Sequence, residues 1–350
     1  MRERGGRLPI GKLPLDALGE VISRIRTYRD PQTTQGPAVG EDAGIIRLPC
    51  CDLAIHSDPI TEASSLAGRL SIIVASNDVA TTGACPRWAS ITIMIPPNSD
   101  IESIKSIAEE AGSIARDLGI DVISGHTEIS PGLAKPILVT TVIGLTCPGC
   151  AIRTGDARPG DIILITGYAG TEGTAILATD FRDKLKDCGV SNETLEGAKS
   201  LGDKVSIVGR ACALASKRLP TAMHDATEGG VIGALVELAL ASNTRVVVYA
   251  ERIPVHPSTT AISNCLDIDY LKLISSGALI FTAPKDKVGD AVSLLKTKGY
   301  PVEVIGRVEE GEPELVLYRG ERVERYSAPP ADEISRVWER YEQEKERESR

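Results

Sequence analysis

A segment rich in glycine, proline and cysteine, residues 147–160, divides the chain into two parts of similar size. Hydrophobic patterns typical of helices and strands alternate on both sides of it, so each part is expected to fold as an α/β unit. A chain of 350 residues is also longer than one hydrophobic core usually supports. We therefore predict an α/β (α+β) protein with two domains, residues 1–150 and 151–330, and a charged helical tail, residues 331–350.

Hydrophobic periodicity predicts the individual elements. Apolar residues at helical spacing predict helices at residues 15–26, 67–82, 100–118, 205–217, 231–241 and 285–298. Alternating or Ile/Val-rich segments predict strands at residues 43–48, 53–56, 88–95, 121–124, 136–146, 161–166, 245–250, 278–283 and 302–308. The tail carries Ile334, Val337, Trp338 and Tyr341 at helical spacing, which predicts a surface helix that frays.

The composition argues against several kinds of partner. The formal net charge is −9, and Lys and Arg form no basic stripe, so we expect no nucleic-acid partner. No apolar run is long enough to cross a bilayer. The basic start of the chain, residues 1–11, is not followed by the apolar stretch of a signal peptide. These features predict a cytoplasmic protein with no membrane partner.

Two glycine-rich segments resemble nucleotide-binding loops but lack essential parts of them. Residues 6–12 contain the glycines and lysine of a phosphate loop, without the Ser or Thr that holds Mg²⁺ and without a preceding strand. Gly167, Gly170 and Gly173 follow a predicted strand, but their spacing differs from that of a dinucleotide-binding fold. Neither motif is expected to bind a nucleotide by its usual mechanism, although a helix start after Gly170 would favour a phosphate.

Carboxylates next to glycine, asparagine and small residues point more strongly to a function. They are Glu41, Asp42, Asp58, Asp78, Glu128, Asp225 and Glu228. Several lie near apolar segments, where an acid is costly unless it is paired or bound to a cation. Mg²⁺ prefers such oxygen ligands and usually shares them with phosphate groups. Taken singly, each acid could also be a turn former or a helix N-cap.

Histidines and cysteines leave alternatives open. His56, His126 and His224 flank these acids. They are expected to hydrogen-bond phosphates or carboxylates, and the alternative is a transition-metal site typical of a hydrolase. Cys147 and Cys150 have C-x-x-C spacing within the linker, for which we expect structural or incidental use, with a local disulfide as the alternative.

Six blocks, in order, resemble the aminoimidazole ribonucleotide (AIR) synthetase superfamily and, within it, HypE-like hydrogenase maturation proteins. The blocks are Gly-Glu-Asp-Ala at 40–43, His-Ser-Asp at 56–58, Ser-Asn-Asp-Val-Ala-Thr-Thr-Gly-Ala-Cys-Pro at 76–86, Gly-His-Thr-Glu at 125–128, residues 159–173, and Met-His-Asp-Ala-Thr-Glu-Gly-Gly-Val at 223–231. The resemblance covers about residues 9–320. Two departures stand out: Glu228 replaces an arginine of the HypE block, and the last cysteine is Cys265, so no C-terminal cysteine is available for self-modification.

The resemblance implies a two-domain fold whose N-terminal sheets pair into a barrel across a homodimer interface, with ATP and Mg²⁺ in a cleft. Carried over by position, Asp42, Asp58, Asp78 and Glu128 would hold Mg²⁺ and phosphate. Asn77, Gly125 and Thr127 would contact the nucleotide, and Asp225, Thr227, Glu228 and His126 would serve catalysis on the substrate side.

The implied function is ATP-dependent activation of an amide or carbamoyl-type oxygen on a small molecule or a carbamoylated partner protein. Three alternatives stay open. They are a small-molecule kinase of the thiamine-monophosphate kinase type, a non-catalytic nucleotide-binding maturation partner, and a His/carboxylate metallohydrolase.

Overall fold

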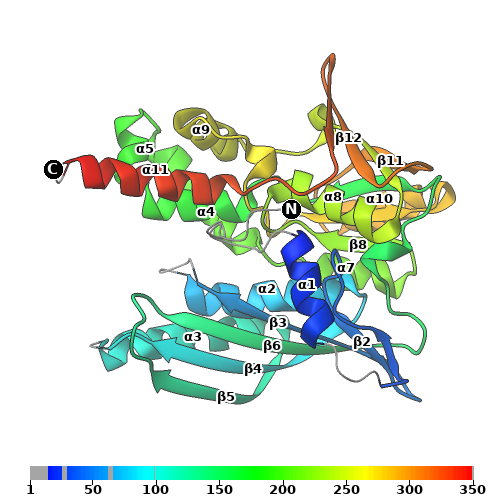
Figure 1. Ribbon diagram of the computed structural model, residues 1–350, viewed down its shortest axis with the longest axis horizontal. Coiled ribbons are helices and arrows are strands. Elements are labelled where there is room, and N and C mark those ends of the chain that lie inside the picture. The colour runs from blue at the N-terminus through cyan, green and yellow to red at the C-terminus, as the bar shows by residue number, and fades with distance from the viewer. Residues whose placement is uncertain (1–14, 26–29, 62–65, 98, 349–350) are drawn as a thin grey trace.

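The computed structural model describes residues 15–25, 30–61, 66–97 and 99–348, which form two domains stacked on one another (Figure 1). The glycine-rich segment at residues 6–12 therefore lies outside the described residues. No helix within the described ranges is long and apolar enough to cross a membrane.

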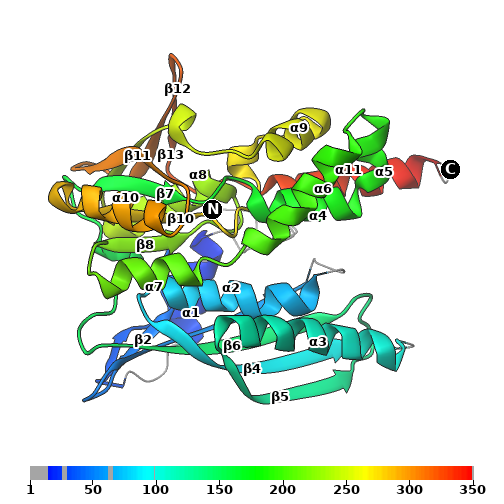
Figure 2. The ribbon, with the colours of Figure 1, turned by 180° about the vertical axis from the view of Figure 1, so that it is seen from behind.

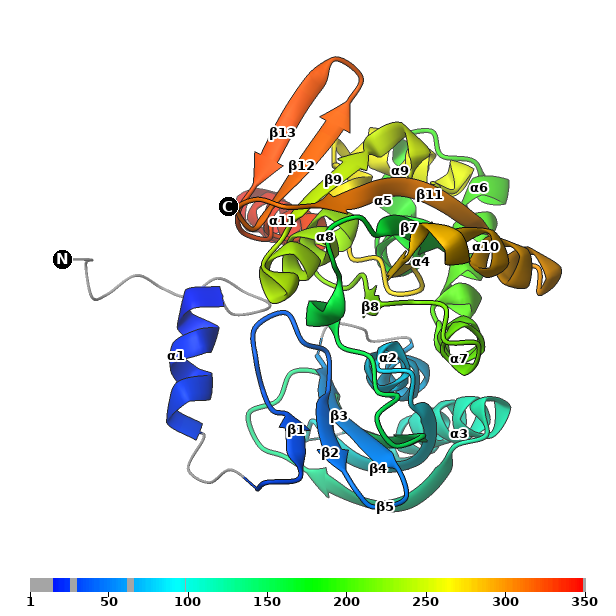
Figure 3. The ribbon, with the colours of Figure 1, turned by 90° about the vertical axis from the view of Figure 1, so that its right-hand side faces the viewer.

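The first domain is built on a six-stranded sheet in the order β1-β2-β3-β6-β4-β5. Neighbouring strands are antiparallel except β4 and β5, which are parallel. The strands are β1 (Thr33–Gln35), β2 (Gly44–Arg47), β3 (Asp52–Ile60), β4 (Cys85–Ile95), β5 (Asp121–Ile129) and β6 (Ile137–Thr146). Helix α1 (Leu15–Ile25) stands to one side of the β1–β2 edge (Figure 3).

Helices α2 (Ala67–Thr81) and α3 (Ile101–Leu118) cover one face of this sheet. α3 is amphipathic and buries Ala111, Ile114 and Ala115, while its N-cap Asp100 accepts a hydrogen bond from the backbone of Ser103. α2 is buried on all sides, because the sheet and α3 pack on one side of it and the second domain packs on the other. Its small residues permit this close packing. α2 therefore forms the first-domain side of the contact with α7 and β8 of the second domain.

The second domain is built on a seven-stranded sheet in the order β13-β12-β9-β11-β7-β10-β8. β12 and β9 are parallel, and the other neighbours are antiparallel. The strands are β7 (Ile162–Thr166), β8 (Ala222–Asp225), β9 (Arg245–Tyr249), β10 (Leu279–Ala283), β11 (Val302–Glu309), β12 (Glu314–Arg319) and β13 (Arg322–Tyr326).

Helices cover both faces of the second sheet. α8 (Gly230–Ser242) packs on one face, and α7 (Val208–Ser216) and α10 (Val288–Thr297) pack on the other. A separate helical layer, seen from behind in Figure 2, contains α4 (Thr171–Asp180), α5 (Arg182–Asp187), α6 (Asn192–Lys199), α9 (Pro257–Leu266) and α11 (Glu333–Glu348). Short 3₁₀ helices lie at Thr154–Asp156, Ser200–Lys204, Ala250–Arg252, Tyr270–Lys272 and Lys285–Lys287.

The structure corrects several predicted elements. The strand predicted at 53–56 extends to Ile60, and the strand predicted at 121–124 extends to Ile129. In both cases polar residues interrupt the apolar pattern while the backbone stays paired with β6 or β4. The prediction omitted β1, β8, β12, β13, α5, α6 and α9, most of which are short segments with weak periodicity.

The predicted surface tail is a helix, but it is not peripheral. Ile334 and Val337 of α11 are buried, and the ring centroids of Trp338 and Phe181 lie 4.6 Å apart. These contacts anchor α11 on the helical layer and place its start beside the cleft between the domains.

Two disulfides are present. Cys147 and Cys150 are bonded within the linker, so the alternative of a local disulfide is the one that the structure shows. Cys188, after α5, is bonded to Cys265 of α9, a pair that the sequence did not indicate.

Candidate functional site

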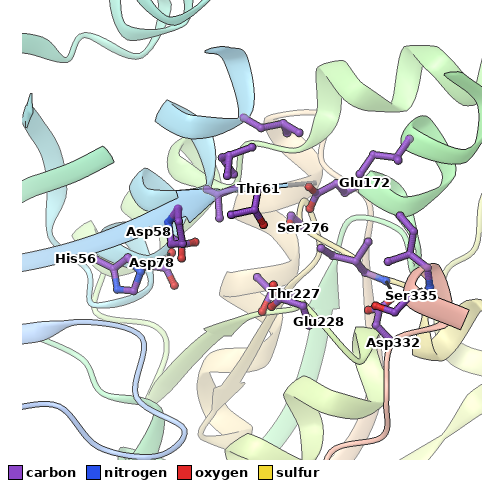
Figure 4. Close-up of a pocket in the computed structure, with 17 residues that line it drawn as sticks. His56, Asp58, Thr61, Asp78, Glu172, Thr227, Glu228, Ser276, Asp332 and Ser335 are labelled. Carbon is purple, nitrogen blue, oxygen red and sulfur yellow. Dashed lines mark hydrogen bonds and ion pairs between the residues drawn. The ribbon is translucent and has the colours of Figure 1, made fainter. Parts of the chain in front are cut away.

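A cavity of about 540 Å³ lies between the two domains (Figure 4). Its first-domain wall comes from β3 and α2, and its second-domain wall comes from α4, the loop between β8 and α8, and the segment that leads into α11. The polar and charged side chains along it are those of His56, Asp58, Thr61, Asp78, Glu172, Thr227, Glu228, Ser276, Asp332 and Ser335. Five carboxylates therefore line one cavity.

The strand β3 directs His56 and Asp58 toward this cavity. Side chains alternate along a strand, and burial along β3 follows that alternation, with His56 and Asp58 less exposed than Ile55 and Ser57. Asp78 comes from the buried helix α2, and its Oδ2 lies 3.6 Å from His56 Nε2. β3 and α2 thus bring three potential ligands together across a sequence separation of 22 residues.

Two overlapping groups in the described chain have ligand atoms that all lie within 4.8 Å of one another. One group contains His56, Asp58 and Asp78, and the other contains Asp42, Asp78 and Asp225. Asp42 comes from the loop before β2, and Asp225 ends β8 of the second domain. Three of the four acids predicted to serve Mg²⁺ and phosphate therefore meet here, and they are joined by Asp225, which was predicted on the substrate side.

The residues present fit a divalent cation. Asp78 and Asp225 are 7% and 2% exposed, and gathering several carboxylates at such depth is costly without positive charge. The buried Oδ2 atom of Asp42 has no hydrogen-bond partner among the described residues. Carboxylate oxygens are the ligands that Mg²⁺ prefers.

His224 fixes the position of Asp42. Its Nδ1 lies 2.6 Å from Asp42 Oδ1, and its Nε2 lies 3.0 Å from Glu237 Oε2. Burial alone would lower the pKa of His224, but the two carboxylates outweigh burial and hold the pKa well above its usual value. The raised pKa favours the imidazolium form of His224, which bridges Asp42 and Glu237.

Glu41 ties the loop that carries Asp42 to the second domain. Its carboxylate accepts hydrogen bonds from the backbone N–H groups of Thr154 and Gly155, both at 3.2 Å. These bonds span more than a hundred residues of sequence, so the position of Asp42 depends on the docking of the two domains.

Asn77 uses its side-chain amide to join two segments of the chain. Its side-chain amide donates to the carbonyl of Val205 at 3.0 Å, and its Oδ1 accepts from the N–H of Ile207 at 2.9 Å. Asn77 is fully buried and does not line the cavity. Its amide joins α2 to the segment before α7, and the predicted nucleotide contact stays a prediction.

The block Gly125–Glu128 also lies away from the cavity. All four residues belong to β5, the edge strand of the first sheet, where every residue is exposed. Glu128 accepts a hydrogen bond from Ser130 at 2.5 Å and lies 3.3 Å from His126 Nε2, and these two neighbours lower its pKa. Within one chain, Gly125, His126, Thr127 and Glu128 do not join Asp42, Asp58 and Asp78.

Thr227 and Glu228 do lie at the cavity, on the turn from β8 into α8. Gly229 and Gly230 follow with φ values of +75° and +63°, a left-handed backbone that favours glycine. A Cβ on Gly230 would lie 2.5 Å from the carbonyl oxygen of Leu271, so the turn leaves no room for a side chain. The glycines thus hold Thr227 and Glu228 at the second-domain wall.

The sequence analysis missed Glu172, Ser276 and Asp332. Glu172 belongs to the first turn of α4, two residues after Gly170, and it is 5% exposed. Burial, together with the smaller effects of the charges on Glu228, Asp332 and Asp58, raises its pKa to about 7, while Ser276 acts to lower it. The acid within the glycine-rich 167–173 segment was a signal that could have identified it.

Asp332 connects the tail to the cavity. Its carboxylate accepts hydrogen bonds from the backbone N–H groups of Gly229 at 2.7 Å, Ile334 at 2.8 Å and Ile274 at 3.3 Å. Burial nevertheless raises the pKa of Asp332 to about 7. One carboxylate therefore holds the start of α8, the segment before Ser276 and the start of α11 together.

Comparisons with known proteins agree with this architecture. Residues 40–146 match the N-terminal domain of the AIR synthase related protein family, and residues 158–318 match its C-terminal domain. The chain is 24% identical over 306 residues to the carbamoyl dehydratase HypE of Rhodobacter capsulatus, covering 85% of this chain and 86% of that protein. It is 27% identical over 309 residues to the thiamine-monophosphate kinase of Pyrococcus horikoshii, covering 82% of this chain and 88% of that protein.

A solved structure of the hydrogenase maturation protein HypE in complex with ATP has the same fold. It superposes with a TM-score of 0.70 at 22% identity, over 90% of this chain and 91% of that chain. The predicted two-domain fold is confirmed, and both named relatives are enzymes, as predicted for this family. With both family domains matched over most of its length, the chain belongs to the AIR synthase related protein family.

Proposed function

We propose that this chain is an ATP- and Mg²⁺-dependent enzyme that activates an amide or carbamoyl-type oxygen of a small molecule or a partner protein. The observation that carries the proposal is the meeting of Asp42, Asp58, Asp78 and Asp225 in two overlapping groups, of which Asp58 and Asp78 line the cavity between the domains. The likeness to a carbamoyl dehydratase and to a HypE structure that contains ATP supports the choice of reaction.

The position of each side chain suggests its role in binding Mg²⁺, the nucleotide or the acceptor. Asp42, Asp58, Asp78 and Asp225 would hold Mg²⁺, which, when bound, supplies the positive charge that neutralises a triphosphate. His224 holds Asp42 in position through the contact of its Nδ1 with Asp42 Oδ1. Thr227 and Glu228 face the cavity from the opposite wall, where the acceptor would lie.

Titration calorimetry with ATP, in the presence and absence of Mg²⁺, tests this assignment. Asp58→Asn and Asp78→Asn should each weaken Mg²⁺–ATP binding at least about tenfold, or about 1.4 kcal/mol. The melting temperature of the ligand-free protein should stay nearly unchanged, since each variant removes a charge from a crowded acidic cluster. Glu312→Gln, an exposed carboxylate far from the cavity, is the matched control. Wild-type affinity for Mg²⁺–ATP in both cluster variants would refute the proposal.

A second candidate is a small-molecule kinase, because the chain is also similar to a thiamine-monophosphate kinase. Product analysis separates the two functions. Release of ADP and phosphate with a dehydrated or carbamoyl-derived product supports the first, whereas a phosphorylated metabolite supports the kinase.

We further infer that two copies of the chain pair through the outer edge of the first sheet. β5 is an edge strand, and its Val122, Ile123 and Ile129 are 40%, 60% and 54% exposed. An apolar edge strand is normally covered by a partner. Pairing there would bring His126 and Glu128 of each copy to the interface.

A further inference from the structure

The two ends of the cavity differ in how their carboxylates are arranged. Asp58 and Asp78 lie at the first-domain end within metal-binding distance of one another, together with His56. Glu172, Glu228 and Asp332 line the second-domain end, which Figure 4 shows as a separate group on the other side of the cavity. Within the described residues these three acids do not form a group at metal-ligand spacing. Their carboxylates line the wall of the cavity and do not come within ligand distance of one common position.

Glu172 has no basic partner among the described residues that line the cavity. It is 5% exposed, and its Oε2 makes no hydrogen bond to any described residue. Ser276 is close enough to influence Glu172, but its Oγ also completes no hydrogen bond in this structure. A buried carboxylate that faces a cavity without a partner is costly, and a ligand with N–H donors would remove that cost.

The surroundings of these acids favour a cation with an organic body. None of the described residues that line the cavity is Lys or Arg, so the acids have no basic side chain to neutralise them there. Ile176, Ile274 and Ile334 line the same cavity and offer an apolar surface. Planar or tetrahedral nitrogen cations pair with carboxylates through directed hydrogen bonds, and their carbon chains suit an apolar wall.

The backbone holds Asp332 in place for such a contact. Three N–H groups already bind its carboxylate, so its position is set before any ligand arrives. Glu228 is positioned by the glycine turn that precedes α8. The three acids therefore come from three separate segments, which are α4, the turn before α8 and the segment that leads into α11.

We propose that Glu172, Glu228 and Asp332 form a subsite for a positively charged nitrogen group, an ammonium, amidinium or guanidinium, carried by the acceptor substrate. This subsite would hold the acceptor on the opposite side of the cavity from Asp58 and Asp78. The assignment of this cation to an acceptor depends on the proposed ATP-dependent function, whereas the binding of the cation does not.

The test compares two probes of the same shape and different charge, butylguanidinium and butylurea, by titration calorimetry with the whole protein. Butylguanidinium should bind at least about tenfold more tightly than butylurea. Glu172→Gln should reduce butylguanidinium affinity at least about tenfold and leave butylurea binding unchanged. Glu228→Gln should act in the same direction, and Glu312→Gln should have no effect.

Each outcome decides the proposal. Equal affinity for the two probes, or binding of neither at millimolar concentration, overturns it. A loss of Mg²⁺ binding by Glu172→Gln in the absence of nucleotide would identify a metal site and would also overturn it. Asp58→Asn separates the two proposals, because it should retain butylguanidinium binding whatever it does to Mg²⁺–ATP. Since Asp332→Asn could disturb the anchoring of α11, the inference is tested on Glu172 and Glu228.

Discussion

Replacing Glu172 with glutamine should change how the stability of the protein depends on pH. Burial is the largest cause that raises the pKa of Glu172, from 4.5 to about 7. The folded protein therefore holds a proton on this carboxyl between pH 4.5 and pH 7, where the unfolded chain has lost it. Stability falls as pH rises through that interval, because the unfolded state binds fewer protons than the folded state.

The magnitude follows from the same two values. At about 1.4 kcal/mol per pKa unit, the interval from 4.5 to about 7 corresponds to a loss of up to about 3 kcal/mol above pH 7. Glutamine keeps the shape and the hydrogen-bonding capacity of a protonated glutamate but cannot ionise. Glu172→Gln should thus be up to about 3 kcal/mol more stable than the wild type at pH 8 and nearly equal to it at pH 4.5.

Urea denaturation of both proteins at a series of pH values between 4.5 and 8 measures this difference, with Glu312→Gln as the exposed control. The free energy of unfolding of the control should follow that of the wild type at every pH. If Glu172→Gln shows the same pH dependence as the wild type, Glu172 is ionised in the folded protein, and the reasoning from its burial fails.

Three further predictions concern other parts of the molecule. Asn77→Ala should lower the free energy of unfolding by about 2 to 4 kcal/mol in urea denaturation, because it leaves two buried backbone groups of the 205–207 segment without partners. Reduction of the Cys188–Cys265 disulfide, which closes a loop of 77 residues, should destabilise the protein by up to about 4 kcal/mol in the same assay. A Cys265→Ser variant should lose most of this response to reductant, and an unchanged response would show that the bridge does not stabilise the fold. Ile123→Lys should shift the mass in light scattering from a dimer to a monomer, whereas Ile101→Lys, at an equally exposed position of α3, should not.

The local pattern of apolar residues was sufficient to predict many of the helices and strands. The apolar spacing of residues 100–118 predicts α3 almost to the residue, because an amphipathic helix buries one face in a fixed period. The small-residue segment at 67–82 likewise predicts α2. The full length of β5 could not be predicted in this way. Its residues 124–128 are polar and lie on an exposed edge strand, so they lack the alternation of apolar and polar residues that indicates a strand.

The candidate site shows a similar division. Asp42, Asp58, Asp78 and Asp225 could be singled out in the sequence, because acids next to glycine or within apolar segments are costly without a partner. The sequence also placed Asn77 and Glu128 with them, on the strength of neighbouring residues and of the family resemblance. Asn77 instead bonds the backbone of another segment, and Glu128 lies on the far edge of the sheet.

The amino-acid sequence by itself determined the family, the two-domain plan, most of the elements and the acids that can bind a cation. Only the tertiary structure decided which of these acids share a cavity. It also showed that Glu172 and Asp332, which lie 160 residues apart along the chain, line the same cavity. The physical reason is that periodicity and residue type act over a few neighbouring residues. The distance between two carboxylates depends on how whole helices and sheets pack.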